Sequence, residues 1–150
     1  MVQPKLTLAE FLPYQLSITS SAVSDLIARA YRGKFALKIP EWRLMAVLGE
    51  VESATQRELV AATAMDKVTV NRASKALEGR ALIGRAPNAA DGRSHHLALT
   101  GTGRELYEQI VPQALSIEAE LEKILGADEA RSLENMLKKL RSQAAALESR

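Results

Sequence analysis

The sequence predicts a mainly α-helical chain with one small β-hairpin, for three reasons. Apolar residues recur at helical spacing over most of the 150 residues. N-cap residues and glycine stops separate these stretches. One interval, around Asp91-Gly92, shows instead two short strand-like runs beside a turn dipeptide. With 47% hydrophobic and 25% charged residues, the composition fits one compact domain over residues 1–150.

Two helices are expected in the first third of the chain. In the first, apolar residues between Leu12 and Ala30 share one face, and Gly33 is the expected stop. The second helix starts near Pro40, where a proline removes no helical hydrogen bond. The apolar stripe of this second helix consists of Leu44, Val47, Leu48 and Val51.

Two shorter helices follow. Residues 55–58 match a capping box, in which Thr55 and Glu58 reciprocally satisfy free backbone amides, so a third helix starts there. Asp66 is a good N-cap for a fourth helix over 67–79, with Gly79 as its stop. Two short helices separated by a turn of about four residues are typical of a helix-turn-helix.

A β-hairpin, or wing, follows the helix-turn-helix. Residues 82–86 and 95–99 are the expected strands. Thr100 can cap a long helix that Pro112 is expected to kink, and a last helix follows Gly126. The predicted architecture is therefore a winged helix-turn-helix at about 40–100, flanked by dimerisation helices at about 7–33 and 101–149. The two flanking segments carry more apolar surface than one copy of the chain can bury, which predicts a homodimer.

Positive charge gathers in the middle of the chain. The net charge is +2, but residues 54–103 contain seven Lys/Arg and four Asp/Glu, an excess of three positive charges. Residues 104–150 carry an excess of negative charge instead. A patch of this size is common on ordinary solvated surfaces, so it indicates a function only if a structural element supports it.

The fourth helix gives that support, because its two faces differ. At 100° per residue, Val70, Ala73, Ser74 and Leu77 fall together as an inner face. The opposite face carries side-chain types that contact guanine, phosphate, adenine and the thymine methyl group. These candidate DNA-binding residues are Lys67, Val68, Thr69, Asn71, Arg72 and Lys75. The alternative is an amphipathic surface helix whose outer side is only solvated.

The hairpin adds a further candidate contact. Arg93 lies beside the turn, within reach of a phosphate or a narrow minor groove. The run Asp91-Gly92-Arg93-Ser94-His95-His96-Leu97-Ala98-Leu99-Thr100, with Gly103 after it, resembles the wing signature of MarR-type regulators. Residues 39–43 and 66–72 resemble the second helix and the recognition helix of the same family.

The resemblance implies a function and roles for particular residues. It implies a transcription regulator that binds double-stranded DNA as a homodimer, on a pseudo-palindromic operator, as a ligand-responsive repressor. Val68 to Lys75 would enter the major groove and Arg93 would sit at the wing tip. Asp91 would position the wing arginine or a basic residue of the recognition helix rather than touch DNA. The first and last helices would form the dimer interface.

A ligand pocket is also implied, between the dimer helices and the DNA-binding lobe. Arg43 can take a carboxylate bidentately while the neighbouring Trp42 offers an aromatic face, which indicates a small aromatic carboxylate. Tyr14 and Ser21 on the first helix are the expected opposite wall. The alternative is that Trp42 belongs to the core and Arg43 is a surface or ion-pair residue.

Several other functions lack support. Without cysteine, the chain can form no disulfide, thiolate zinc site or thiol switch. His95 and His96 are adjacent on an expected strand and point to opposite faces, so no metal site is expected. No catalytic constellation and no cofactor motif are found, since Gly101-Thr102-Gly103 lacks a third glycine and a βαβ context.

Two expectations complete the reading of the sequence. No apolar run is long enough to cross a membrane and no signal-peptide pattern is seen, which predicts a cytoplasmic protein. The runner-up function is a winged helix used only for protein contacts. Such a module would keep its binding when Arg72 and Arg93 are lost.

Overall fold

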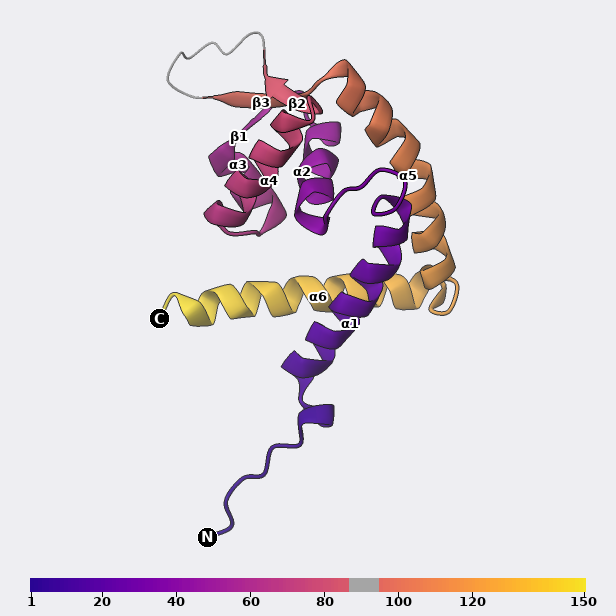
Figure 1. The fold of residues 1–150 in the computed structure, drawn as a ribbon. Helices are drawn as coiled ribbons and strands as arrows, with labels where there is room; N and C mark the ends of the chain where they lie inside the picture. The colour runs from indigo at the N-terminus through magenta and orange to yellow at the C-terminus, as the bar shows by residue number, and fades with distance from the viewer. Residues whose placement is uncertain (87–94) are drawn as a thin grey trace. The chain divides into compact units, whose positions relative to one another are not determined.

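The computed structural model describes residues 1–86 and 95–150 (Figure 1). It divides into two compact units, Met1–Gln113 and Ala114–Arg150, which are described separately. The helical elements are η1 (Leu8–Glu10), α1 (Leu12–Ile27), η2 (Ala28–Ala30), α2 (Ile39–Glu50), α3 (Gln56–Thr63), α4 (Lys67–Gly79), α5 (Gly101–Glu122) and α6 (Gly126–Glu148). The strands are β1 (Ala54–Thr55), β2 (Ile83–Arg85) and β3 (His96–Leu99). The predicted fold class, mainly helical with a small β element, is confirmed.

The sheet has three antiparallel strands in the order β1-β3-β2. The hairpin strands β2 and β3 were expected, with Gly84 opposite Ala98 in the observed register. Strand β1 is an addition, in which Thr55 lies opposite His96. Two residues are too few to show the alternation by which a strand is recognised in a sequence. This third strand ties the hairpin to the start of α3.

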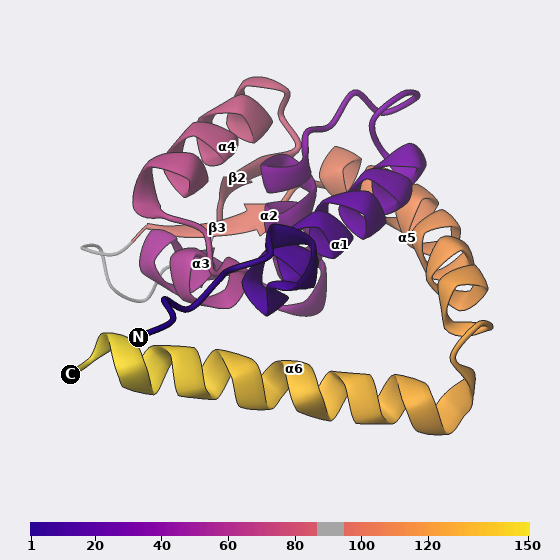
Figure 2. The same ribbon diagram turned by 90° about the horizontal axis from the view of Figure 1, so that it is seen from below.

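The core of the first unit lies where α2, α3 and α4 pack against one another and against the sheet (Figures 1 and 2). Each of the three helices contributes side chains that are fully buried, and the sheet and α5 close the cluster. The largest apolar contributors are Leu44, Met45, Leu48, Leu59, Val70, Leu77, Leu82, Ile83, Leu97 and Ile110. These interlocking apolar faces fix the position of α4 within the unit.

The ends of two helices differ from the sequence-based expectation. Helix α1 ends at Ile27, before the predicted stop at Gly33, because the chain tightens into the 3₁₀ turn η2 and buries Ala28 and Ala30. At α3, the Thr55 hydroxyl accepts a hydrogen bond from the Glu58 amide at 3.1 Å, as predicted. The Glu58 carboxylate, however, accepts from that same hydroxyl at 3.0 Å, which differs from the reciprocal backbone bond of a full capping box.

The start of α5 is fixed by a threonine and a glycine. The Thr100 hydroxyl accepts from the Gly103 amide at 3.0 Å, which confirms the predicted cap, and donates to the Ala81 carbonyl at 2.7 Å. A Cβ on Gly103 would overlap the carbonyl oxygen of Leu82. Only glycine therefore lets α5 start this close to the strand that leads into the wing.

The second unit holds the end of α5 and all of α6. None of its residues is buried, and most of the large apolar side chains of α6 are exposed in this single chain, namely Leu133, Met136, Leu140 and Leu147. Helix α5 runs on through Pro112, at the junction of the two units, and the expected kink there stays a prediction. Among the described residues, no helix combines the length and the hydropathy needed to span a membrane.

Candidate nucleic-acid interface and ligand pocket

Helix α4 begins at a strong cap. One Asp66 carboxylate oxygen accepts from the Thr69 amide at 2.7 Å and the other accepts from the Thr69 hydroxyl at 2.9 Å. These two hydrogen bonds, the backbone one first, lower the pKa of the exposed Asp66 carboxyl below its ordinary value. The carboxylate also opposes the positive end of the helix dipole. The first turn of α4 is thereby held in a defined conformation.

The inner face of α4 is buried as the periodicity predicts. Val70, Ala73, Ser74 and Leu77 are between 0% and 4% exposed. Within this face, the Ser74 hydroxyl accepts a hydrogen bond from the side-chain amide of Gln56 at 3.1 Å. Because Gln56 is the first residue of α3, this bond joins the two helices of the helix-turn-helix to each other.

The outer face of α4 is open to solvent. Lys67, Asn71, Arg72 and Lys75 are exposed, and Val68 keeps 66% of its surface accessible. Thr69 is half-buried, with its hydroxyl engaged by Asp66. In the part of the chain that the structure describes, none of the three cations on this face forms an ion pair. Their charges are therefore available to an anionic partner.

A hollow between α3 and α4 contains a cation that the sequence analysis did not assign to a site. It has a volume of about 430 Å³ and is lined by Gln56, Arg57, Val60 and Lys67. Arg57 is exposed in the first turn of α3 and Lys67 starts α4, so two cations flank one depression. The signal that could have identified Arg57 is its place two residues after the Thr55 cap, in the first turn of α3, which is the positive end of the helix.

The wing is described only in its strands. Arg85 is exposed on β2. The predicted wing residues Asp91 and Arg93 fall in 87–94 and lie outside the described residues. Within the described residues, no group of three His, Asp or Glu side chains is arranged to hold a metal ion.

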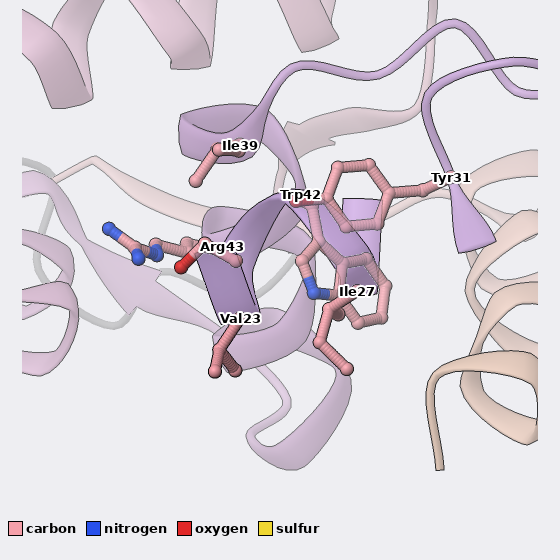
Figure 3. Close-up of a pocket in the computed structure, with 7 residues that line it drawn as sticks. Val23, Ile27, Tyr31, Ile39, Trp42 and Arg43 are labelled. Carbon is pink, nitrogen blue, oxygen red and sulfur yellow. The ribbon is translucent and has the colours of Figure 1, made fainter. Parts of the chain in front are cut away.

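A small pocket lies between α1 and α2 (Figure 3). Its volume is about 160 Å³, and Trp42 and Arg43, two of the four predicted ligand residues, line it. The guanidinium of Arg43 and the indole of Trp42 extend in different directions from α2 (Figure 3). The full lining consists of Val23, Ser24, Ile27, Tyr31, Ile39, Trp42 and Arg43.

The other two predicted ligand residues do not line this pocket. Its α1 wall is made by Val23, Ser24 and Ile27. Ser21 precedes Val23 by two positions, which turns it to the other side of the helix. Tyr14 lies more than two helical turns before Val23, roughly 13 Å along the axis at 1.5 Å per residue.

Aromatic stacking holds Trp42 in place. Its ring lies 5.4 Å from that of Tyr31, at an interplanar angle of 20°, and 6.1 Å from that of Tyr107, at 24°. A Cβ on Gly49 would overlap the Tyr107 ring, so this glycine opens the space that Tyr107 occupies. Burial raises the pKa of the Tyr31 hydroxyl, partly offset by the nearby positive charges of Arg32 and Arg43. The stacked rings of Tyr31 and Trp42 therefore form one aromatic side of the pocket.

A helix-turn-helix followed by a hairpin that pairs with a third short strand defines a winged-helix protein. The sequence model of the MarR family matches residues 37–94, the segment from the start of α2 into the wing. Solved structures of regulators from that family match over about nine-tenths of the chain. The chain is therefore similar to the MarR family of transcription regulators, in sequence over residues 37–94 and in fold over most of its length.

Three solved structures illustrate this similarity. A MarR/EmrR family transcriptional regulator from Acinetobacter sp. ADP1 has 26% identity and a TM-score of 0.85, covering 94% of this chain and 99% of the other. A probable transcriptional regulator from Pseudomonas aeruginosa has 26% identity and a TM-score of 0.79, covering 89% and 99%. BpsR from Bordetella bronchiseptica shares the fold at 22% identity and a TM-score of 0.81, covering 92% and 98%. No curated protein matches the sequence.

Proposed function

We propose that this protein is a homodimeric, sequence-specific binder of double-stranded DNA that acts as a ligand-responsive repressor. The observation that carries the proposal is the outer face of α4, where Arg72, Lys75 and Asn71 are exposed while the opposite face of the helix is locked into the core. A major groove is about 12 Å wide and accepts one helix of this kind. The predicted residues Lys67, Val68 and Thr69 lie on its first turn, the end that reaches the bases in a helix-turn-helix.

Arg72 tests base reading. Arg72→Ala should weaken operator binding by roughly 1–3 kcal/mol and relax the preference at one position of each half-site, because a guanidinium reads guanine bidentately. The operator is taken as the duplex that the wild-type protein enriches from fragments of its source genome. Arg32→Ala is the matched control, since Arg32 is a similarly exposed arginine whose 3.7 Å contact with Asp25 lies outside α4. Equal affinities for the Arg72 variant and the wild type would rule out the groove assignment.

The wing and the hollow between α3 and α4 are proposed to contact the phosphate backbone of DNA. Arg93, with Asp91 positioning it, would reach a phosphate or the minor groove, and Arg57 with Lys67 would hold a phosphate at the α3–α4 hollow. Arg93→Ala and Arg57→Ala should therefore weaken binding evenly across sequences. Because one phosphate contact is lost in each subunit of the homodimer, each variant should also reduce the steepness of log affinity against log salt by roughly two. An unchanged slope in both variants would contradict the phosphate assignment.

Dimerisation is proposed from the exposed apolar side chains of the flanking helices. Leu12 and Leu16 on α1, and Met136 and Leu140 on α6, are exposed large hydrophobic residues in a single copy. In this proposal residues 1–150 act as one domain whose helices at about 7–33 and 101–149 pair with a second copy. Two recognition helices would then address half-sites roughly 10 bp apart.

A charge placed on α6 tests the dimer. Leu140→Glu should shift the protein from dimer to monomer in sedimentation at micromolar concentration, because an unpaired carboxylate is poorly tolerated in an apolar interface. Ser142→Glu adds the same charge at 200° around the helix from Leu140 and should leave the dimer intact. A monomeric wild-type protein with full operator affinity would overturn the proposal.

The α1–α2 pocket is proposed as the effector site, with a small aromatic carboxylate as its ligand. Trp42 offers an aromatic surface held by stacking on Tyr31, and Arg43 offers an exposed cation at the same pocket. DNA binding of BpsR, the Bordetella protein of the same fold, is regulated by 6-hydroxynicotinic acid, an aromatic carboxylate. Tyr14 and Ser21 would take part only if α1 shifts when the ligand binds.

The effector proposal is tested by release from DNA. An aromatic carboxylate that raises the melting temperature should also release the operator, and Arg43→Ala should abolish release while affinity without ligand stays within about twofold. Arg32→Ala again serves as the matched control. If 6-hydroxynicotinate and related acids at millimolar concentration change neither melting nor DNA binding, the aromatic-acid assignment is wrong.

A further inference from the structure

Arg80, directly after the last residue of α4, joins the recognition helix to a segment far away in the sequence. Its Nη2 donates to the Phe35 carbonyl at 2.8 Å and its Nη1 donates to the Ala36 carbonyl at 3.1 Å. Two consecutive carbonyls are thus bound by two nitrogens of one planar group, a geometry that the single ammonium of lysine does not reproduce. Both bonds cross more than forty residues of sequence.

The segment that Arg80 holds connects η2 to α2. Ala36 lies in the left-handed region, at φ 53, which an alanine adopts only when its surroundings impose it. On either side of it, Phe35 and Leu37 are buried, and the Leu37 amide donates to the Tyr31 carbonyl at 3.1 Å. The two bonds from Arg80 therefore hold the chain at its strained residue.

We propose that Arg80 is a positioning residue for DNA reading, which fixes the C-terminal end of α4 against the connection between α1 and α2. This inference rests on the proposed DNA-binding function. The side chain is occupied by the two carbonyls, and the residue lies at the end of α4 opposite to the Asp66 cap. Arg80 is thus assigned to the orientation of the helix and not to a contact with DNA.

This role predicts a loss of specificity with little loss of general affinity. Base-edge hydrogen bonds need the helix in one orientation, whereas phosphate contacts tolerate small rotations. The same connection ends in Tyr31 and Ile39, which line the α1–α2 pocket, so Arg80 also links the pocket wall to α4. A residue away from both ligands can change the coupling between two sites, and the tenfold change in affinity expected here corresponds to about 1.4 kcal/mol.

The experiment compares Arg80→Met, Arg80→Lys and Arg32→Met in the full chain. The probes are the duplex that the wild-type protein enriches from a random-sequence pool and a scrambled duplex of equal length and composition. Arg80→Met should lose about tenfold in affinity for the enriched duplex and less than twofold for the scrambled one, with an unchanged salt slope. Arg80→Lys should lose an intermediate factor, and Arg32→Met should match the wild type.

Hydrogen exchange adds a readout that does not depend on DNA. The hydrogen-exchange rate of the Leu37 amide should be higher in Arg80→Met than in the wild type, and it should be unchanged in Arg32→Met. A smaller salt slope with equal losses on both duplexes would make Arg80 a phosphate contact and overturn the proposal. Wild-type affinity and exchange in Arg80→Met would overturn it as well. If the wild-type protein enriches no sequence from the pool, the proposed DNA-binding function is wrong. If the wild type prefers the enriched duplex and Arg80→Met prefers it equally strongly, only the role proposed for Arg80 is wrong.

Discussion

Helices α4 and α6 are both amphipathic, but their apolar faces end in different places. In α4, Val70 and Leu77 are completely buried by α2, α3 and the sheet of the same chain. In α6, the apolar residues Leu133, Met136, Leu140 and Leu147 keep between 39% and 53% of their surface exposed. The same helical periodicity of apolar residues thus gives a buried face in α4 and an exposed face in α6. The difference separates an apolar face that is buried within one chain from an apolar face that is left exposed in a single copy.

The largest expected effect is a difference in unfolding free energy between two Leu→Ala variants, one in each region. Leu48 on α2 is 0% exposed, so Leu48→Ala should lower the free energy of unfolding by about 2–5 kcal/mol through the cavity it leaves. Leu140→Ala removes the same atoms from a side chain that is 39% exposed in one copy. Measured by urea unfolding at a protein concentration where the chain is monomeric, Leu140→Ala should change the free energy of unfolding by less than about 0.5 kcal/mol. Equal losses would remove the distinction between the two regions.

The next effect tests how tightly the first unit is packed where α5 begins. Gly103→Ala places a Cβ against the Leu82 carbonyl oxygen and should lower the free energy of unfolding by about 1–3 kcal/mol. Gly101→Ala is the matched control, because no atom lies within 4 Å of a Cβ there. That variant should be as stable as the wild type or slightly more stable, since alanine favours helix. Thermal melting of both variants checks the prediction.

A smaller effect is expected at the cap of α3. Thr55→Ala removes the hydroxyl that accepts from the Glu58 amide and should lower the free energy of unfolding by about 1 kcal/mol. Thr55→Ser keeps the hydroxyl and should recover most of that loss. A melting temperature of Thr55→Ala equal to that of the wild type would show that solvent replaces the cap without loss.

The smallest effect concerns pH and the exposed Asp66 cap. Because hydrogen bonds from Thr69 lower the pKa of this carboxyl in the folded state, its contribution to stability is complete above the ordinary value of 3.8 and is lost as pH falls through the lower folded pKa. Asp66→Asn keeps an acceptor that does not titrate. Urea midpoints of the wild type should therefore fall toward those of Asp66→Asn in acid, and parallel curves would contradict this assignment.

The winged-helix part of the fold could be predicted because its signals are local. The buried face of α4, its Asp66 cap and the Thr100 cap of α5 each follow from residues within one or two turns of each other. Strand β1 could not be predicted, since its two residues are ordered by pairing with β3 some forty positions later. The position of η2 likewise depends on the burial of Ala28 and Ala30 by other elements.

The candidate sites divide in the same way. The exposed side of α4 was predicted residue by residue from the helical period. Trp42 and Arg43 were chosen as ligand candidates from their side-chain types, and both line the pocket. The wall from α1 depends on how that helix is rotated, which places Val23 and Ile27 there. Arg80 carries no motif at all. Its role emerges only from hydrogen bonds to Phe35 and Ala36 across the unit.

The stacking of Trp42 between Tyr31 and Tyr107 has an optical consequence. Trp42 is the one tryptophan of the sequence, and it lies at the pocket between α1 and α2. Excitation at the red edge of protein absorbance therefore addresses a single indole whose surroundings are set by two tyrosine rings and the pocket wall. The intrinsic fluorescence of Trp42 therefore reports changes in the surroundings of this pocket without any added label.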